Sequence, residues 1–283
     1  MKAKLWILRA LFVAAEVFIV VLIVMKLTEG KEISMSNWLS VVSPIVALIA
    51  TFVPDIGNKK GKKLEQMAAR YLDRAFDGHK KEKAQFMRGF AFWDMGKYPQ
   101  AIAALEKLSK TTDEAPIVAR AKAHIGRCYL DAQEYAKAAE LYEEALNYDP
   151  SFVLAWSNLA TVYDRLGKEP AESVRVLETA IFYDPDYEIA YNKLSMYYSM
   201  AQNNEKSEWA ARNAIRLNPK RPENYSNLAW TLCAMGRADE AEEAYLKALS
   251  VGYKDDGTLA KLVRNTKAVT APVKNSDTDE EDY

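Results

Sequence analysis

The sequence predicts an all-α protein, in which an N-terminal transmembrane helical hairpin is followed by an α-solenoid of about five helix pairs with a capping helix. Two observations support this prediction. Two apolar runs near the amino terminus have the character of membrane-spanning helices. Farther along, a pattern of helix, turn, helix and proline recurs, and Pro150, Pro185 and Pro219 stand 35 and 34 residues apart. A fixed period of this length indicates stacked helical repeats.

Composition and charge exclude several classes of function. Among the 283 residues, 38 Lys and Arg nearly balance 39 Asp and Glu, so the chain as a whole has no electrostatic attraction to nucleic acid. Its two cysteines, Cys128 and Cys233, lie far apart and form no metal-binding motif with His79 or His124. We therefore expect no nucleic-acid partner, no disulfide framework, no metal and no cofactor.

Residues 1–57 are predicted to form the two-helix transmembrane hairpin. The first span, about 5–27, is long enough to cross a hydrocarbon core of about 30 Å as a helix. The second span, about 37–54, is shorter and contains Pro44, but Trp38 stands at its start, as expected at a membrane interface. The alternative is a secretory signal peptide. The length of the first run and the lack of a small-residue cleavage site after it argue against that alternative.

The distribution of lysine and arginine predicts the orientation of the hairpin. Basic residues precede the first span and follow the second, whereas lysines and glutamates balance in the connecting loop. The positive-inside rule then places both termini in the cytoplasm, in a multi-pass protein of the cell (inner) membrane. The flanking basic residues are Lys2, Lys4, Arg9, Lys59, Lys60, Lys62 and Lys63.

Glu16 lies at the middle of the first span, where a carboxylate needs a polar partner. In an antiparallel hairpin Ser43 would lie opposite it, within a stripe of small residues that permits close packing. Two interpretations remain open. Glu16 either forms a hydrogen bond inside the hairpin or contacts another membrane subunit.

Residues 58–81 are predicted to form a basic juxtamembrane linker and an N-terminal capping helix. The apolar residues of this helix, about 64–77, recur at helical spacing, and Gly78 is expected to end it. The residues that share the apolar face are Leu64, Met67, Ala68, Tyr71, Leu72, Ala75 and Phe76.

Several positions recur in phase with the prolines, and each has a packing role. Small residues let helices approach closely, and large residues fill the space beside them. The recurring positions are Ala145, Ala180, Ala214 and Ala248; Tyr129, Tyr163 and Tyr198; and Leu159, Leu194 and Leu228. With Trp156, Ala160 and Gly167 in the first helix and turn of one copy, and Ala138 and Tyr142 in a second helix, the pattern resembles the tetratricopeptide repeat family.

The resemblance covers about two-thirds of the chain, in five copies. They extend over about residues 82–118, 119–152, 153–187, 188–221 and 222–253. A C-terminal capping helix should complete the array, which then comprises residues 82–268. Residues 269–283 form an acidic tail that we expect to be disordered. The tail could aid solubility or bind a basic groove, and both alternatives stay open.

No catalytic motif is present: we find no phosphate-binding glycine loop, no nucleophile elbow and no metal-ligand spacing. We therefore expect a binding protein and not an enzyme. The resemblance implies that the first helices line a concave face, which holds a peptide or a helix of a partner protein.

One stripe of the first helices supplies the predicted partner-binding groove. Asparagine amides can bond an extended backbone, and Arg and Lys can pair with carboxylates, so we expect a partner with an acidic or polar segment. We also expect Arg120 and Arg127 to serve the ligand and not the fold. The groove residues are Arg120, His124, Arg127, Asn158, Arg165, Asn192, Lys193, Asn227 and Trp230.

Together these features predict a membrane-anchored tetratricopeptide scaffold or adaptor with a cytoplasmic binding groove. The alternative is a dedicated non-catalytic subunit of a membrane protein complex, which the chain would contact through its transmembrane hairpin.

Overall fold

The computed structural model describes residues 54–270. The predicted membrane spans therefore lie outside the described residues, apart from Pro54, and so do Glu16, Ser43 and the tail beyond Thr270. The chain divides into two compact units, residues 1–66 and 67–283. The packing described below is that of the second unit.

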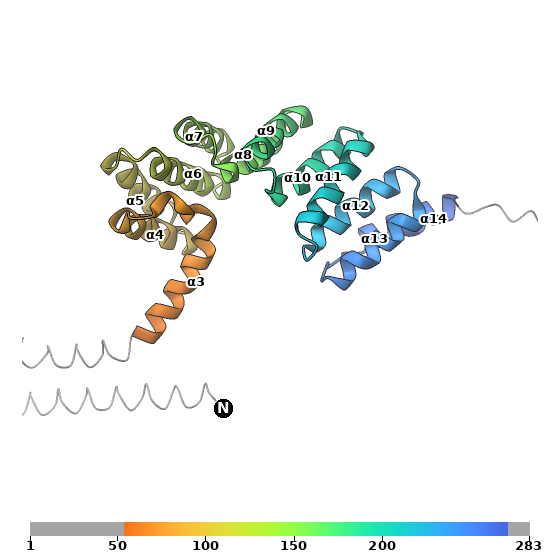
Figure 1. Ribbon diagram of the computed structural model, residues 1–283, viewed down its shortest axis with the longest axis horizontal. Coiled ribbons are helices and arrows are strands. Elements are labelled where there is room, and N and C mark those ends of the chain that lie inside the picture. The colour runs from red at the N-terminus through yellow and green to blue at the C-terminus, as the bar shows by residue number, and fades with distance from the viewer. Residues whose placement is uncertain (1–53, 271–283) are drawn as a thin grey trace, which may run out of the picture. The chain divides into compact units, whose positions relative to one another are not determined.

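Helices are the only regular secondary structure among the described residues, which confirms the all-α prediction for this part of the chain (Figure 1). They contain twelve α-helices, one short 3-10 helix and no strand. The elements are α3 (Pro54–Leu72), η1 (Arg74–Phe76), α4 (Lys80–Asp94), α5 (Tyr98–Thr111), α6 (Ala115–Asp131), α7 (Tyr135–Tyr148), α8 (Val153–Arg165), α9 (Pro170–Tyr183), α10 (Glu188–Met200), α11 (Asn204–Leu217), α12 (Pro222–Ala234), α13 (Ala238–Ser250) and α14 (Thr258–Thr270). None of them is long and apolar enough to cross a membrane.

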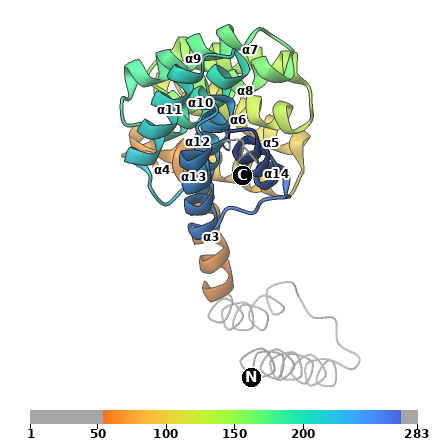
Figure 2. The same cartoon turned by 90° about the vertical axis from the view of Figure 1, so that its right-hand side faces the viewer.

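The helices from α4 to α13 form five antiparallel pairs that stack in chain order. The second helix of each pair packs against the first helix of the next pair. First helices of neighbouring pairs also touch one another, whereas second helices show no comparable contact within residues 54–270. The stack therefore curves with α4, α6, α8, α10 and α12 on its inner side, which we call the concave face. Figure 2 shows the array from the end formed by α13 and α14.

The turn inside each helix pair needs one residue with a positive φ. Gly96, Gly167 and Gly236 supply it with φ values of 70°, 70° and 72°, a region that glycine adopts freely. In the second and fourth pairs Gln133 and Gln202 take the same place, with φ values of 64° and 58°. The left-handed conformation costs a residue with a Cβ about 1 kcal/mol or more. Helix stacking therefore imposes this turn even where the local sequence disfavours it.

Two helical glycines at the same repeat position meet different surroundings. A Cβ on Gly89 would lie 2.6 Å from Cγ of the fully buried Leu105, whereas a Cβ on Gly126 would meet nothing closer than 3.4 Å. We expect Gly89→Ala to lower the free energy of unfolding by about 1–3 kcal/mol, because Leu105 must move. Gly126→Ala should change it by less than about 1 kcal/mol. Urea denaturation of both variants measures this difference, and equal losses would contradict the described packing.

The two ends of the array are closed in different ways. At the carboxyl end, α14 packs against α12 and α13 and buries Leu259 and Val263, as expected of a capping helix. At the amino end, the sequence predicted a capping helix over 64–77. The structure instead has α3 ending at Leu72 and η1 following it, and η1 contacts two first helices, α4 and α6. We call residues 67–76 the covering segment.

Candidate functional site

The first helices present equivalent positions to the concave face, and the chemistry of these positions changes along the array. One position holds Phe90, Arg127, Thr161, Met196 and Trp230 in the five copies. The position three residues earlier holds Met87, His124, Asn158, Lys193 and Asn227. The face therefore begins with aromatic and basic residues, continues with small polar ones and ends with large apolar side chains.

The chain itself covers the beginning of this face. The ring of Tyr71, in the covering segment, lies edge-on to His124 with the centroids 4.7 Å apart, and 6.3 Å from the ring of Phe90. Burial raises the pKa of Tyr71 to about 12. Phe76 follows with its ring centroid 5.2 Å from that of Phe86. The covering segment thus occupies the place where the sequence predicted a ligand.

Arg120 joins the covering segment to the array. Its Nε donates to both carboxylate oxygens of Asp73 at 3.2 Å, and its two terminal nitrogens make ion pairs with Asp73 and Asp149. The guanidinium carbon lies 4.1 Å from the ring centroid of Phe152, and only 6% of Arg120 is exposed. The expectation that Arg120 faces a ligand and is dispensable for folding therefore needs correction. Asp73 of the chain itself provides the carboxylate that the prediction had assigned to a partner.

His124 is a buried residue and not an exposed one. Its ring stacks on Phe90 with the centroids 4.8 Å apart and 13° between the planes, and Trp93 lies edge-on at 5.3 Å. Neither ring nitrogen has a hydrogen-bond partner within the described part of the chain. Burial, reinforced by the nearby charge of Arg127, lowers the pKa of His124 to about 3. A neutral, fully covered imidazole cannot contact a ligand while the covering segment is in place.

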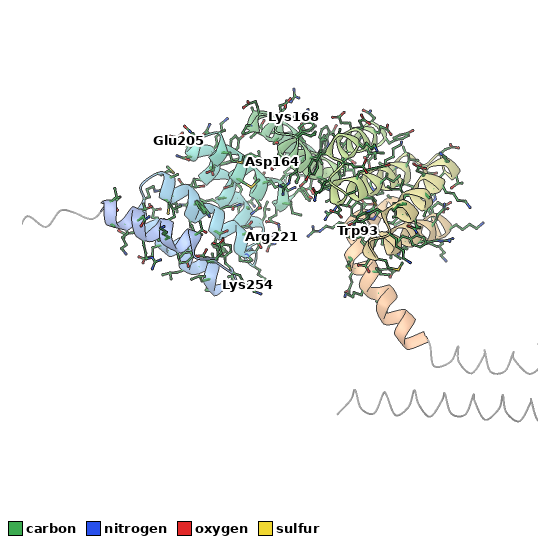
Figure 3. The ribbon with its side chains drawn as sticks, turned by 180° about the vertical axis from the view of Figure 1, so that it is seen from behind. Trp93, Asp164, Lys168, Glu205, Arg221 and Lys254 are labelled. Atoms are coloured by element: carbon green, nitrogen blue, oxygen red, sulfur yellow. The ribbon has the colours of Figure 1, made fainter. Side chains whose placement is uncertain are left out.

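Arg127 is partly engaged within its own helix. Its Nε donates to Oδ1 of Asp131 at 3.0 Å, and the guanidinium lies 5.6 Å from the ring centroid of Trp93. Trp93, labelled in Figure 3, donates its ring N–H to the same carboxylate at 2.8 Å. Burial alone would lower the pKa of Arg127, but Tyr71 and Asp131 outweigh burial and raise it.

The middle of the concave face holds a lysine bonded to neutral groups. Nζ of Lys193 donates to the backbone oxygen of Ser157 at 2.6 Å and to the Thr161 hydroxyl at 2.5 Å. Burial, and secondarily Arg127, lower the pKa of Lys193 to about 8. Asn158, which lies between Ser157 and Thr161 on α8, is 8% exposed. Lys193 therefore carries a charge at pH 7 that no carboxylate of residues 54–270 neutralises.

A ladder of amides links α10 to α12. Nδ2 of Asn192 donates to Oδ1 of Asn224 at 2.8 Å, and Nδ2 of Asn227 donates to the backbone oxygen of Asn192 at 3.1 Å. An ion pair of 3.4 Å between Arg221, labelled in Figure 3, and Glu188 joins the starts of the same two helices. Asn192 and Asn227 therefore position the two helices through their Nδ2 groups.

The last third of the concave face is uncovered. Met196, Met200 and Trp230 are 41%, 53% and 39% exposed, respectively. Arg165, at the end of α8, is exposed as well. We call these four residues, with Lys193, the open part of the concave face.

The nine predicted groove residues fall into two groups. Arg120 and His124 are buried under the covering segment. Asn158 is almost completely buried, and the guanidinium of Arg127 is partly engaged by Asp131. Arg165, Asn192, Lys193, Asn227 and Trp230 line the remainder of the face. Sequence reasoning missed the covering role of Tyr71 and Asp73, and the exposure of Met200. The only signal of this covering role in the sequence was Asp73, a carboxylate that stands close to the aromatic residues of an apolar helix face.

Five stacked helix pairs with first helices on a concave face place the protein in the class of α-solenoid repeat proteins. Sequence models of the tetratricopeptide repeat match residues 86–152, 129–195 and 210–243. The chain belongs to the tetratricopeptide repeat family.

Solved structures of similar fold include several proteins of this family. TTC0263, a tetratricopeptide protein of Thermus thermophilus, is 24% identical with a TM-score of 0.51, over 66% of this chain and 99% of that one. A tetratricopeptide protein of Parabacteroides merdae gives 18% and 0.55, over 67% and 73%. MamA of Desulfovibrio magneticus RS-1 gives 18% and 0.52, over 62% and 97%. No curated protein matches the sequence. At these identities the likeness shows the fold alone.

Proposed function

We propose that this protein is a membrane-anchored tetratricopeptide scaffold whose concave face binds a helix or peptide of a partner protein. The observation that supports this best is the open part of the concave face. Three large apolar side chains are exposed there beside two cations. Exposed apolar side chains gathered on one concave surface are typical of protein-interaction sites.

The chemistry of the open part suits a segment with both apolar and acidic residues. Met196 and Met200 are flexible and adapt to apolar side chains of different shape. Trp230 offers the kind of large, rigid contact that dominates binding energies. Arg165 can pair bidentately with a carboxylate, and Lys193 stays charged below pH 8.

Trp230 is the residue with which to test this proposal. We expect Trp230→Ala in the full-length chain to weaken partner capture about tenfold or more, because it removes the largest exposed contact of the face. The matched control is Leu246→Ala, which removes a more exposed apolar side chain from α13, a second helix. Capture from native membranes with quantitative mass spectrometry measures both variants. Equal partner profiles for the two variants would refute binding at the open part.

Membrane anchoring rests on the apolar runs 5–27 and 37–54 and on the lysines around them. We expect reporters fused after Lys63 and after Tyr283 to be located in the cytoplasm, because both positions follow the positive flank of the hairpin. A protease-protection assay on intact inverted and right-side-out vesicles measures this topology. Export of either reporter, or release of the chain from membranes by alkaline carbonate, would overturn the anchoring proposal.

A further inference from the structure

The covering segment contacts the array as a bound peptide does. Its Tyr71 enters a pocket of aromatic rings from Phe90, His124 and Phe152, and two residues later Asp73 accepts hydrogen bonds from Arg120. The residues that contact the segment come from the first two repeats, and Phe90, Arg120 and His124 among them stand on first helices. One aromatic side chain and one carboxylate are thus recognised at a fixed separation.

The surface beneath the segment contains buried polar side chains, Arg120 and His124, as well as apolar rings. Both ring nitrogens of His124 are buried there without hydrogen-bond partners among residues 54–270. Buried polar groups in a permanent core are nearly always paired. Unpaired polar groups under the segment indicate a surface that can also bond to another occupant.

The fit of the segment is also incomplete. A hollow of about 720 Å³ opens beside it. It is lined by Arg70, Asp73 and Arg74 of the segment and by Asp149 and Tyr187 of the array. A longer occupant that followed the same path would fill this hollow and gain contacts that the covering segment lacks.

The connection to α4 permits the segment to leave. Only residues 77–79 separate η1 from α4. Gly78 among them has a φ of 81°, and a Cβ at this position would have no atom within 4 Å. An open glycine of this kind is a suitable hinge. The link is short, so a displaced segment stays close and competes at an effective concentration in the millimolar range or above.

We propose that the covering segment occupies a second peptide-binding site, which takes in exchange a helical segment of a partner protein with an aromatic residue two positions before a carboxylate. This inference rests on the proposed function of the array as a peptide-binding scaffold. It adds a second site at Phe90, Arg120 and His124, which is separate from the open part. The covering segment blocks this site, and competition with the segment sets the affinity of the site for a partner.

The test uses a fluorescent peptide of residues 64–78 (LEQMAARYLDRAFDG) as a surrogate partner, with the purified full-length chain. We expect Tyr71→Ala in the chain to tighten binding of the peptide about tenfold or more, because the internal competitor is weakened. Asp77→Asn, at an exposed acid of the same connection, is the matched control and should leave binding unchanged. A peptide carrying Asp73→Asn should bind the Tyr71→Ala chain several-fold more weakly.

Hydrogen exchange keeps the test decisive if Tyr71→Ala does not fold. On the unmodified chain, millimolar peptide should accelerate amide exchange in residues 71–77 and leave α8 unchanged. No acceleration, or no binding by a folded Tyr71→Ala chain, would overturn the proposal. Dimers of the unmodified chain in which residues 71–77 exchange faster would assign the site to a second copy and overturn the partner assignment. Capture through Trp230 is measured separately, so the proposed function can stand if this inference fails.

Discussion

Replacing Arg120 with alanine should lower the free energy of unfolding by about 2–3 kcal/mol, since the buried Arg120 is the partner of the largely buried Asp149 and of the more exposed Asp73. Arg120 pairs with Asp73 and Asp149, and these two carboxylates would lose their shared counter-charge. The guanidinium also covers the ring of Phe152, so apolar contact is lost together with the charge. Denaturation by urea, followed by far-ultraviolet circular dichroism, measures the change.

Arg165→Ala is the matched control for this prediction. Arg165 was predicted for the same groove, but it is exposed on the concave face, so its removal should change stability by less than about 0.5 kcal/mol. If both substitutions proved neutral, Arg120 would be a free groove residue, as the sequence suggested. Loss of stability in Arg120→Ala alone would support the described ion network.

The second large effect concerns pH and His124. Its pKa is about 3 in the folded protein and 6.5 in the unfolded chain, because burial disfavours the charged imidazole. Below pH 6.5 the unfolded chain therefore binds a proton that the folded protein does not. The stability contributed by neutral His124 is complete above pH 6.5 and falls as the pH falls toward 3, by about 2 kcal/mol at pH 5.

His124→Phe isolates this effect from other titrations. Arg127 is the charged group that acts on His124, and Tyr71 faces it from the covering segment. Both keep their charge state between pH 5 and 7, since the pKa of Arg127 is raised above its ordinary value and that of Tyr71 is about 12. We expect His124→Phe to lose most of the stability change between pH 7 and pH 5 in urea denaturation. An unchanged slope would show that the imidazole is solvated in the folded protein.

The helical architecture of residues 82–268 could be predicted well because its signals are local and repeated. Prolines mark the ends of second helices, and Pro150 and Pro219 each lie between two helices of the structure. Glycines mark three of the five inner turns, at Gly96, Gly167 and Gly236. The turns at Gln133 and Gln202 carry no such mark, but the phase of the repeat predicted them. Because the five copies share one pattern, the lack of a glycine in two of them did not prevent the prediction of their helices.

The binding face was predicted less well because a stripe of residues does not reveal what covers it. The positions of Arg120 and His124 in the first helices were deduced from the period, yet both are buried. The side chains that bury them, Tyr71 and Asp73, come from a segment before the repeats. Phe90 and His124 belong to different copies, so their common pocket forms only when the pairs stack.

The sequence by itself determined the class of fold and the phase of the five helix pairs, since these follow from short-range periodicity, and the family resemblance implied that the first helices share one face. It could not distinguish Gly89 from Gly126, which occupy the same repeat position. Only the tertiary structure decided that Leu105 crowds the first of them, that the covering segment closes one end of the concave face and that Trp230 remains exposed at the other. These outcomes depend on which side chains of distant segments fill a given volume, and a repeat period carries no information about distant segments.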